Sequence, residues 1–447
     1  MFLRRHRMGQ AEDSFFAQKS FGSGHSFEDW WRRYGKDHPE WFQFNPDGTR
    51  GPADPARPNR FTMCVSNAAF QAEIVRRWKE ERAKFPGEPY NIVVGENDDS
   101  ARCLCETCKS WDGPPPDVSK LPPGLERSFT PTQASNRYAR FAEAVRALAA
   151  RTDPNVRVHY YAYLNYFWAP DPSIKMHPNV YVGFVPWFRA AGWFPRTGAE
   201  QEWIKEQWAG WRRSGASLFY RPNWFLDGYT MPLVSMHQFA DAFQYYARNG
   251  MQGSDFDSLQ GQWAAQGPYL YLLARLHVRP DAPVDELLDE YYGAFGPASE
   301  TIKKYWDEWE SYAVRNSPRA VQSIRSRRGG NFRRYALYAQ VADELYPPEC
   351  FGPSKALLER AAGQAADAPL CRDRVAFLRD GLRHSEEASR TAAAVNDPAK
   401  PLAEKRAALA RLLALRKSLE HTNIANMDRA AIIETDSWKE VQGLFGP

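Results

Sequence analysis

A group of acidic residues follows a short apolar run near residue 92, and its residue types could carry out acid–base chemistry. The run at 92–94 is Ile-Val-Val, a pattern typical of a strand buried on both faces of a parallel sheet. Glu96, Asp98 and Asp99 come directly after it, around Asn97. Charged groups are costly to bury unless they are paired or used. In barrels of alternating strands and helices, active sites lie at the carboxyl ends of the strands. We therefore predict a catalytic site here.

The spacing of the acids suggests separate roles. If the strand continues through them, Glu96 and Asp98 share one side and their Cα atoms lie about 6–7 Å apart, whereas Asp99 faces away. Two carboxylates so placed could act as a proton donor and an orienting group, and we take Asp98 and Glu96 as the catalytic pair. The alternative is a structural one, because Asp and Asn are common in turns and caps.

Three cysteines, Cys103, Cys105 and Cys108, follow the acids. They could supply three thiolates to a structural zinc ion. The first spacing is a single residue, however, and a fourth ligand is not evident. Free buried thiols or a local disulfide are the preferred interpretation, and we expect no metal and no cofactor. The motifs of phosphate loops, zinc proteases and serine hydrolases are absent from the sequence.

Other polar and aromatic residues follow the remaining predicted strands or lie in the Gly- and Pro-punctuated stretch at 9–60. A pocket that combines carboxylates with Tyr, Trp, Arg and Asn suits glycoside hydrolysis. The alternatives are core packing for each aromatic residue and a structural role for the histidine. The candidates for substrate binding are Arg5, His25, Asn97, Asp99, Tyr161, Tyr163, Trp187, Tyr220, Asn223, Trp224, Asp255 and Asp257.

Strands and helices alternate through the first 280 residues, which argues for an α/β fold with a parallel sheet. The predicted strands lie near 1–8, 61–65, 91–95, 156–164, 179–185, 217–222 and 251–256. The predicted helices between them include 67–84, with Asn67 as its cap, and 135–151, with Tyr138 on its apolar stripe. We interpret this as a (β/α)8 barrel over 1–280 that lacks its first strand, with 91–95 as strand four. Residues 281–447 are rich in Arg, Ala, Leu and Glu, and we expect them to form an α-helical domain that begins with a helix at 283–315 and turns its charged runs toward solvent.

Composition narrows the function classes. The net charge of +4 over 447 residues gives no sign of a nucleic-acid partner. There is no run of 18 apolar residues, so no membrane span is expected. The first residues lack the apolar core of a secretory signal. We therefore expect that an amino-terminal part is missing, and that the protein is exported if that part carries a signal peptide.

Several motifs resemble the domain-of-unknown-function family DUF4838, which overlaps glycoside hydrolase family 163. They are RRHRMG at 4–9, GHSFEDWW at 24–31, HPEWFQFNPDGTR at 38–50, Asn97-Asp98 with the cysteines, and the stretch at 269–296. The resemblance implies an endo-β-N-acetylglucosaminidase-like enzyme that acts on an N-acetylglucosamine-containing glycan. Configuration would be retained through the acetamido group of the substrate, with the acid at the end of strand four. A non-catalytic carbohydrate-binding relative and a metal-dependent hydrolase that uses the cysteines remain alternatives.

Overall fold

The computed structural model describes residues 20–22, 24–54, 56–99, 101–115, 117–122, 133–186, 197–222, 229–256, 262–326 and 337–444. The strand predicted near residues 1–8 lies outside these ranges. The chain divides into two compact units. The first takes the described parts of Met1–Arg189, Thr197–Pro222 and Tyr245–Phe256, and the second takes those of Asn223–Gln244 and Asp257–Pro447.

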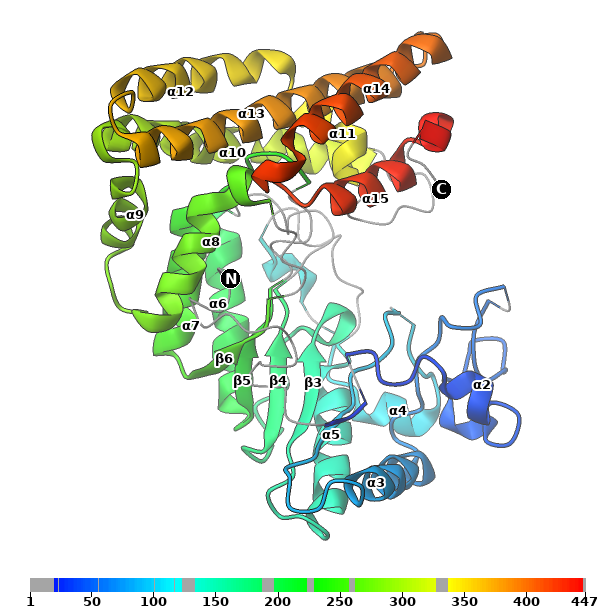
Figure 1. Ribbon diagram of the computed structural model, residues 1–447. Helices are drawn as coiled ribbons and strands as arrows, with labels where there is room; N and C mark the ends of the chain where they lie inside the picture. The colour runs from blue at the N-terminus through cyan, green and yellow to red at the C-terminus, as the bar shows by residue number, and fades with distance from the viewer. Residues whose placement is uncertain are drawn as a thin grey trace. The chain divides into compact units, whose positions relative to one another are not determined.

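The first unit is built on a parallel sheet of six strands (Figure 1). The strands follow one another across the sheet in chain order, and every neighbouring pair is parallel. They are β1 (Ser20–Phe21), β2 (Asn91–Val93), β3 (Val158–Ala162), β4 (Val180–Phe184), β5 (Ser217–Tyr220) and β6 (Met251–Ser254). The predicted α/β class with a parallel sheet is confirmed.

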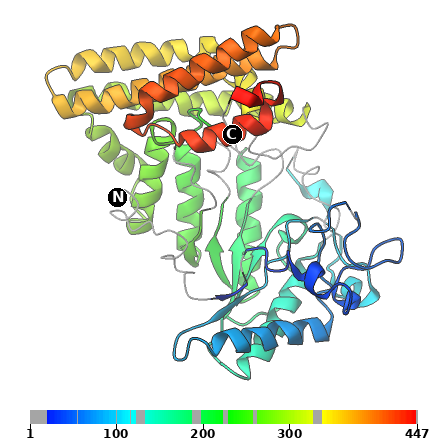
Figure 2. The ribbon, with the colours of Figure 1, turned by 45° about the vertical axis from the view of Figure 1, so that its right-hand side comes forward.

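Helices lie between consecutive strands of the sheet, as is usual for parallel neighbours, except between β3 and β4, where residues 163–179 form a loop with the 3-10 turn Leu164–Tyr166. The helix predicted at 67–84 begins where Asn67 accepts a hydrogen bond of 2.9 Å from the backbone N–H of Phe70. This helix, α3 (Ala68–Arg82), lies side by side with α5 (Ser135–Ala150), as Figure 2 shows. The helices of this unit are α2 (Trp30–Tyr34), α3 (Ala68–Arg82), α4 (Glu106–Trp111), α5 (Ser135–Ala150), α6 (Gly198–Arg213) and part of α7 (Met236–Arg248).

Aromatic side chains on one face of the sheet pack against these helices. Phe184 at the end of β4 contacts Trp208 of α6 edge-on, with ring centroids 5.3 Å apart. Tyr220 at the end of β5 lies 4.7 Å from Tyr246 of α7 by the same measure. Because side chains alternate along a strand, this parity assigns the intervening residues to the opposite face.

On the opposite face of the sheet, aromatic rings from β3 and β5 lie next to Gly183 of the strand between them, β4. A Cβ atom added to Gly183 of β4 would lie 2.5 Å from an atom of Tyr161 on β3 and 2.5 Å from an atom of Phe219 on β5. Glycine at this position therefore makes room for both rings.

Residues 61–65 do not form the predicted sheet strand, and β1 at Ser20–Phe21 pairs with β2 instead. The apolar run is buried because a loop layer covers it, with a single antiparallel bridge between Met63 and Phe42. Side chains satisfy some of its backbone donors: the N–H of Thr62 donates to Gln43 Oε1 at 2.7 Å. A run that is mostly apolar and fully buried fits a strand and a loop equally well, which explains the error.

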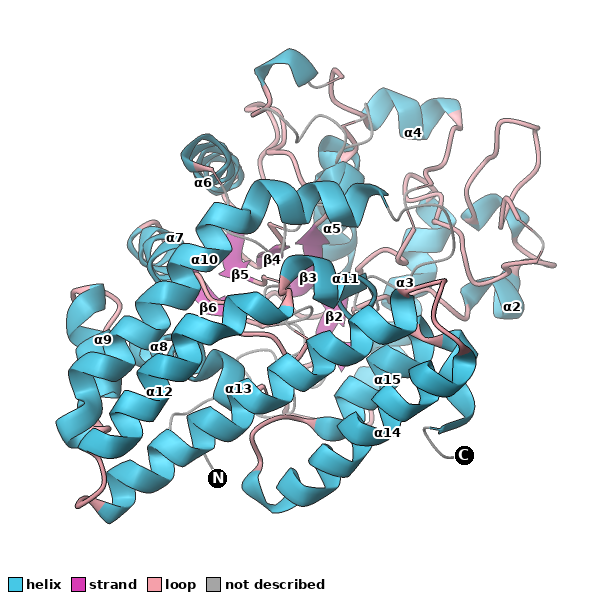
Figure 3. Ribbon diagram, turned by 90° about the horizontal axis from the view of Figure 1, so that it is seen from above, coloured by secondary structure: helices cyan, strands magenta, loops and turns pink. Residues whose placement is uncertain are grey.

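The described elements of the second unit are helical. The helix predicted at 283–315 is in fact two helices, because the chain breaks at a short 3-10 turn in which Gly296 has a φ of +54°. In Figure 3, α13 lies between α12 and α14, and it packs on both. The helices are α8 (Trp263–Val278), α9 (Val284–Gly293), α10 (Ser299–Ser326), α11 (Leu337–Leu345), α12 (Gly352–Gln364), α13 (Pro369–Asn396), α14 (Leu402–Leu419) and α15 (Met427–Ser437).

Helix α8 belongs to this second unit, whereas the sequence suggests a boundary at residue 280. Its backbone explains the difference, since the N–H of Ala264 donates to the carbonyl of Ile424 at 2.9 Å, and Gly381 of α13 packs against Ala264. A buried ion pair between Arg416 and Glu434, at 2.5 Å, adds a polar link between α14 and α15.

Candidate functional site

Glu96 is the most unusual acid of the predicted cluster, because its carboxylate is 2% exposed and surrounded by donors. It accepts hydrogen bonds from the backbone N–H groups of Met63 (3.1 Å) and Asn97 (3.0 Å) and from the hydroxyl of Tyr138 (3.1 Å). Burial raises the pKa of Glu96 to about 7, although these three donors act in the opposite direction. A carboxyl group with such a pKa can exchange a proton near neutral pH.

Two buried tyrosines accompany Glu96, and sequence reasoning did not place them at the site. The rings of Tyr138 on α5 and Tyr166, which follows β3, lie 4.3 Å apart by their centroids. Burial raises the pKa of the Tyr166 phenol well above its ordinary value, and charges on Glu96 and Asp98 act in the same direction. Tyr166 therefore lies within electrostatic reach of both predicted catalytic acids. The sequence indicated only that Tyr138 belongs to the apolar stripe of its helix.

Asp98 differs from Glu96 in its exposure and its partner. Its side chain is 43% exposed, and its Oδ2 lies 3.5 Å from Nη1 of Arg60, which also donates to the Asp98 carbonyl. Asp99 accepts a hydrogen bond of 2.8 Å from the backbone N–H of Ala101, as a turn residue would. Strand alternation does not apply to these acids, because β2 already ends at Val93. The premise that Glu96 and Asp98 share one side of a strand is therefore wrong.

The segment at 24–27 lies directly against the end of β2. Asn97 is 2% exposed and joins two segments: its Oδ1 accepts from the N–H of Phe27 at 3.2 Å, and its Nδ2 donates to the carbonyl of Phe61 at 3.1 Å. His25 Nδ1 donates to the Glu96 carbonyl at 2.8 Å. Because a carbonyl oxygen only accepts, Nδ1 of His25 carries the hydrogen of this bond.

A small pocket lies on the side of the sheet that faces away from the helices, with a volume of about 80 Å³. The guanidinium carbon of Arg221 lies 4.7 Å from the centre of the Tyr161 ring, and Arg221 Nε lies 3.6 Å from Asp255 Oδ2. The residues that line this pocket come from β1, β2, β3 and β5 and from the segments after β1 and β6: Ser20, Gly24, Asn91, Val93, His159, Tyr160, Tyr161, Phe219 and Asp255.

The structure thus brings two predicted residues, Tyr161 and Asp255, to one pocket, and Arg221 contacts both of them. The sequence did not single out Arg221, although its place directly after β5, at the carboxyl end of a strand, was an available signal. His159, which also lines this pocket, is buried. Desolvation, with a smaller contribution from Arg157, lowers the pKa of His159 to about 3, so this imidazole is neutral at pH 7.

The remaining candidates lie elsewhere or outside the described residues. Tyr220 is 0% exposed, and its ring packs against Tyr246 and Phe256, because strand parity turns it toward the helices. It is a core residue. Tyr163 is 8% exposed and precedes the 3-10 turn after β3. Outside the described ranges are Arg5, Trp187, Asn223, Trp224 and Asp257.

The three cysteines after the acids meet a fourth one. The Sγ atoms of Cys64, Cys103, Cys105 and Cys108 all lie within 4.8 Å of one another. All four are free cysteines, so the local disulfide considered above is wrong. The missing fourth position is filled by Cys64, which lies 39 residues before Cys103 and gave no recognisable spacing in the sequence. These residues could hold a metal ion.

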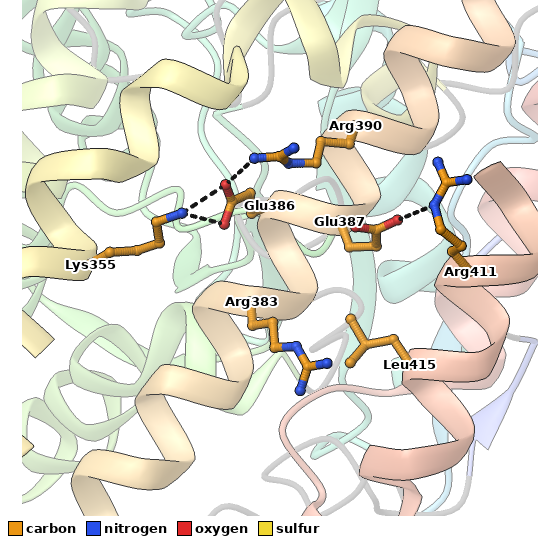
Figure 4. Close-up of a pocket in the computed structure, with 7 residues that line it drawn as sticks. All are labelled: Lys355, Arg383, Glu386, Glu387, Arg390, Arg411 and Leu415. Atoms are coloured by element: carbon orange, nitrogen blue, oxygen red, sulfur yellow. Dashed lines mark hydrogen bonds and ion pairs between the residues drawn. The ribbon is translucent and has the colours of Figure 1, made fainter. Parts of the chain in front are cut away.

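The second unit contains a larger pocket of about 340 Å³ among α12, α13 and α14 (Figure 4). Most of its lining side chains are charged and pair with one another. Lys355 Nζ lies 3.0 Å from both carboxylate oxygens of Glu386, which Arg390 also contacts at 2.8 Å. Glu387 Oε1 lies 3.6 Å from Arg411 Nε. These contacts fit the solvated charged face that the sequence suggests for the helices.

The fold of the first unit and the acids after β2 define an α/β protein with a polar site at the carboxyl ends of the strands of a parallel sheet. The chain belongs to the DUF4838 family, because the family model described as "Domain of unknown function (DUF4838)" matches residues 2–307. Comparison with curated proteins and with solved structures gives no match. Among the described residues, none of the helices has the length and apolar character needed to cross a lipid bilayer.

Proposed function

We propose that this protein is a glycoside hydrolase that acts on an N-acetylglucosamine-containing or related complex glycan. The observation that carries the proposal is the pairing of a buried carboxyl of raised pKa, Glu96, with an exposed carboxylate, Asp98, two residues further on. In hydrolases that use two carboxyl groups, the environments of the two groups often push their pKa values apart, so that each group holds the protonation state that its role requires. The resemblance to glycoside hydrolase family 163 supports the same substrate class.

The two environments suggest the roles. Glu96, with a pKa of about 7, can hold a proton at neutral pH and would protonate the leaving oxygen. Asp98 is exposed beside Arg60, and its side-chain oxygens would accept a hydrogen bond from the acetamido N–H of the sugar. The acetamido oxygen would then attack the anomeric carbon as the glycosidic bond breaks, and water would later open the resulting ring with retention of configuration.

The barrel architecture is part of this proposal. The six described strands are parallel and follow one another in uninterrupted chain order with helices packed on one face, which is consistent with part of a (β/α)8 barrel, whereas doubly wound sheets reverse their order. We infer that the first unit follows the barrel plan. The helices from α8 onward would form a separate domain.

A second function has its own support. Glu96 is buried and already accepts three hydrogen bonds, which suits an anchor as well as an acid. The protein would then bind a carbohydrate without cleaving it, through the Tyr161 and Phe219 rings on the pocket side of the sheet.

The dependence on the leaving group distinguishes the two roles of Glu96. We expect Glu96→Gln to lower hydrolysis of a natural glycan by roughly 10²–10⁴-fold, the usual contribution of a positioned acid. An aryl N-acetylglucosaminide with an acidic phenol as leaving group needs no protonation, so the same variant should retain most of its activity on that compound. An equal loss on both compounds would assign Glu96 an anchoring role. Glycan binding by calorimetry without any cleavage by the unmodified protein would support the carbohydrate-binding function instead.

A further inference from the structure

We propose that Cys64, Cys103, Cys105 and Cys108 bind one zinc ion in a structural tetrathiolate site. Cys64 lies in the buried loop at 61–65, and the other three side chains come from the segment that leads into the first turn of α4; three of the four are buried. This inference does not depend on the proposed hydrolase activity.

The distances between the sulfur atoms match a metal site. Cys64 Sγ lies 3.7 Å from Cys105 Sγ and 3.9 Å from Cys108 Sγ. With a Zn–S bond of about 2.3 Å, a regular tetrahedron places its sulfur atoms roughly 3.8 Å apart. A disulfide would require about 2.05 Å. The side chains are therefore spaced as four ligands around a common centre.

Hydrogen-bond donors lie next to three of the four sulfur atoms. The backbone N–H of Phe44 donates to Cys103 Sγ at 3.3 Å, and the N–H of Cys108 donates to Cys105 Sγ at 3.4 Å. The hydroxyl of Ser66 lies 3.1 Å from Cys108 Sγ and can donate to it. Donors of this kind orient the ligands of a metal site and stabilise their negative charge.

Two arginines bring positive charge to the sulfur atoms, and one of them, Arg137, is also paired with Asp112. A zinc ion with four thiolates carries a net charge of −2, which is costly to bury without positive neighbours. Arg50 lies within electrostatic reach of Cys64, Cys103 and Cys105, and Arg137 lies within reach of Cys108. Arg137 is 1% exposed and donates to the carbonyl of Cys103 at 2.9 Å.

The donor set selects the metal and its role. Four soft thiolates in a tetrahedral arrangement favour zinc or iron over calcium or magnesium. Since the protein supplies all four ligands, no position remains for water or substrate, and the site is structural rather than catalytic. Zinc is the divalent ion with which such closed sites are most often filled.

The site would hold the acidic loop at both ends. Met63, next to Cys64, donates its N–H to Glu96, and Cys103 follows the acids after a short stretch. The N–H of Leu104 also donates to the carbonyl of Phe44 at 2.9 Å. A zinc ion that joins Cys64 to Cys103 would therefore close a loop that contains Glu96, Asp98 and Asp99.

Metal analysis of the full-length protein tests the proposal. After purification without chelators, we expect about one zinc ion per chain, and at least a fivefold loss in Cys64→Ser and Cys105→Ser. Cys371→Ser is the matched control, because Cys371 lies in α13, outside the cluster, and its substitution should leave the zinc content unchanged. A protein that takes up less than a fifth of an equivalent from added zinc under reducing conditions would overturn the proposal, as would one that binds iron in its place.

A second measurement covers variants that fail to fold. In the unmodified protein, alkylation should modify only Cys350 and Cys371 while zinc is bound, and all six thiols after a strong chelator has removed it. Loading with Co²⁺ should produce the sulfur-to-cobalt charge-transfer absorption of a tetrathiolate site. Alkylation of all six thiols before any chelator is added, or a cobalt spectrum without this absorption, would contradict the assignment.

Discussion

The backbone N–H of Met63 donates a hydrogen bond of 3.1 Å to Oε2 of Glu96. This contact joins two loops that lie 33 residues apart in the sequence, and it places the buried carboxylate next to the chain that carries Cys64. The N–H of Cys64 in turn donates to the carbonyl of Trp41 at 2.8 Å. The carboxylate of raised pKa is therefore hydrogen-bonded to the residue that directly precedes one cysteine of the cluster.

Glu96 should make the stability of the protein depend on pH. Because burial raises its folded-state pKa to about 7 from an ordinary value of 4.5, its contribution is fully present below pH 4.5 and is lost as the pH rises through 7. The free energy of unfolding of the unmodified protein, relative to that of Glu96→Gln, should fall by about 2–3 kcal/mol between pH 5 and pH 8. Urea unfolding of both proteins at several pH values measures it.

Subtraction of the variant removes the effects of other titrating groups, such as the buried His159. Glu106→Gln is the matched control, because the Glu106 side chain is 91% exposed and carries no burial penalty. A difference between the unmodified protein and Glu96→Gln that stays constant with pH would contradict the raised pKa.

The buried ion pair between Arg137 and Asp112 should contribute more to stability than an exposed ion pair does. Arg137 holds Asp112 through two hydrogen bonds of 2.8 Å, and both groups are largely buried. Arg137→Met removes both hydrogen bonds from the buried Asp112 carboxylate and leaves it only the longer contact of 3.6 Å with Arg102, so we expect a loss of about 3 kcal/mol in the free energy of unfolding. Arg82→Met, which removes a more exposed pair with Asp153, should cost about 1 kcal/mol or less. Equal losses in chemical denaturation would contradict the difference in burial.

Gly183 should be required for the pocket side of the sheet. A methyl group there would overlap the rings of Tyr161 and Phe219, so Gly183→Ala should destabilise the protein by about 1–3 kcal/mol and displace the pocket wall. Gly198→Ala is the control, because an added Cβ at the start of α6 meets no atom within 4 Å. Thermal melting and glycan binding compare the two variants. Unchanged melting and binding in Gly183→Ala would mean that the rings can move aside.

Local sequence signals predicted much of the fold. Helix α3 followed from its cap at Asn67, and β3 and β4 followed from their apolar runs. Residues 61–65 were assigned to a strand because burial by a loop produces the same run of apolar residues. β1 was missed since two residues give no periodic signal.

The site was harder to predict, because its members come from distant segments. The acids after β2 were visible as a cluster, but only the three-dimensional structure separates the buried Glu96 from the exposed Asp98. Cys64 and Arg221 had no local motif that could link them to Cys103 or Asp255. Tyr220 was assigned to the site because its strand parity cannot be read without the sheet.

Hydrolysis by matched Asp98 and Asp99 variants tests the central proposal most directly. The unmodified protein should cleave an N-acetylglucosamine-containing glycan with retention of configuration at the anomeric carbon, as followed by NMR. Asp98→Asn should lower the rate by roughly 10²–10⁴-fold. Asp99→Asn should have a much smaller effect, because an Asn oxygen can still accept the hydrogen bond from Ala101. Equal and small effects in two variants with unchanged thermal melting would contradict the assignment of catalysis to this loop, and no cleavage by the unmodified protein across such glycans would contradict the hydrolase itself.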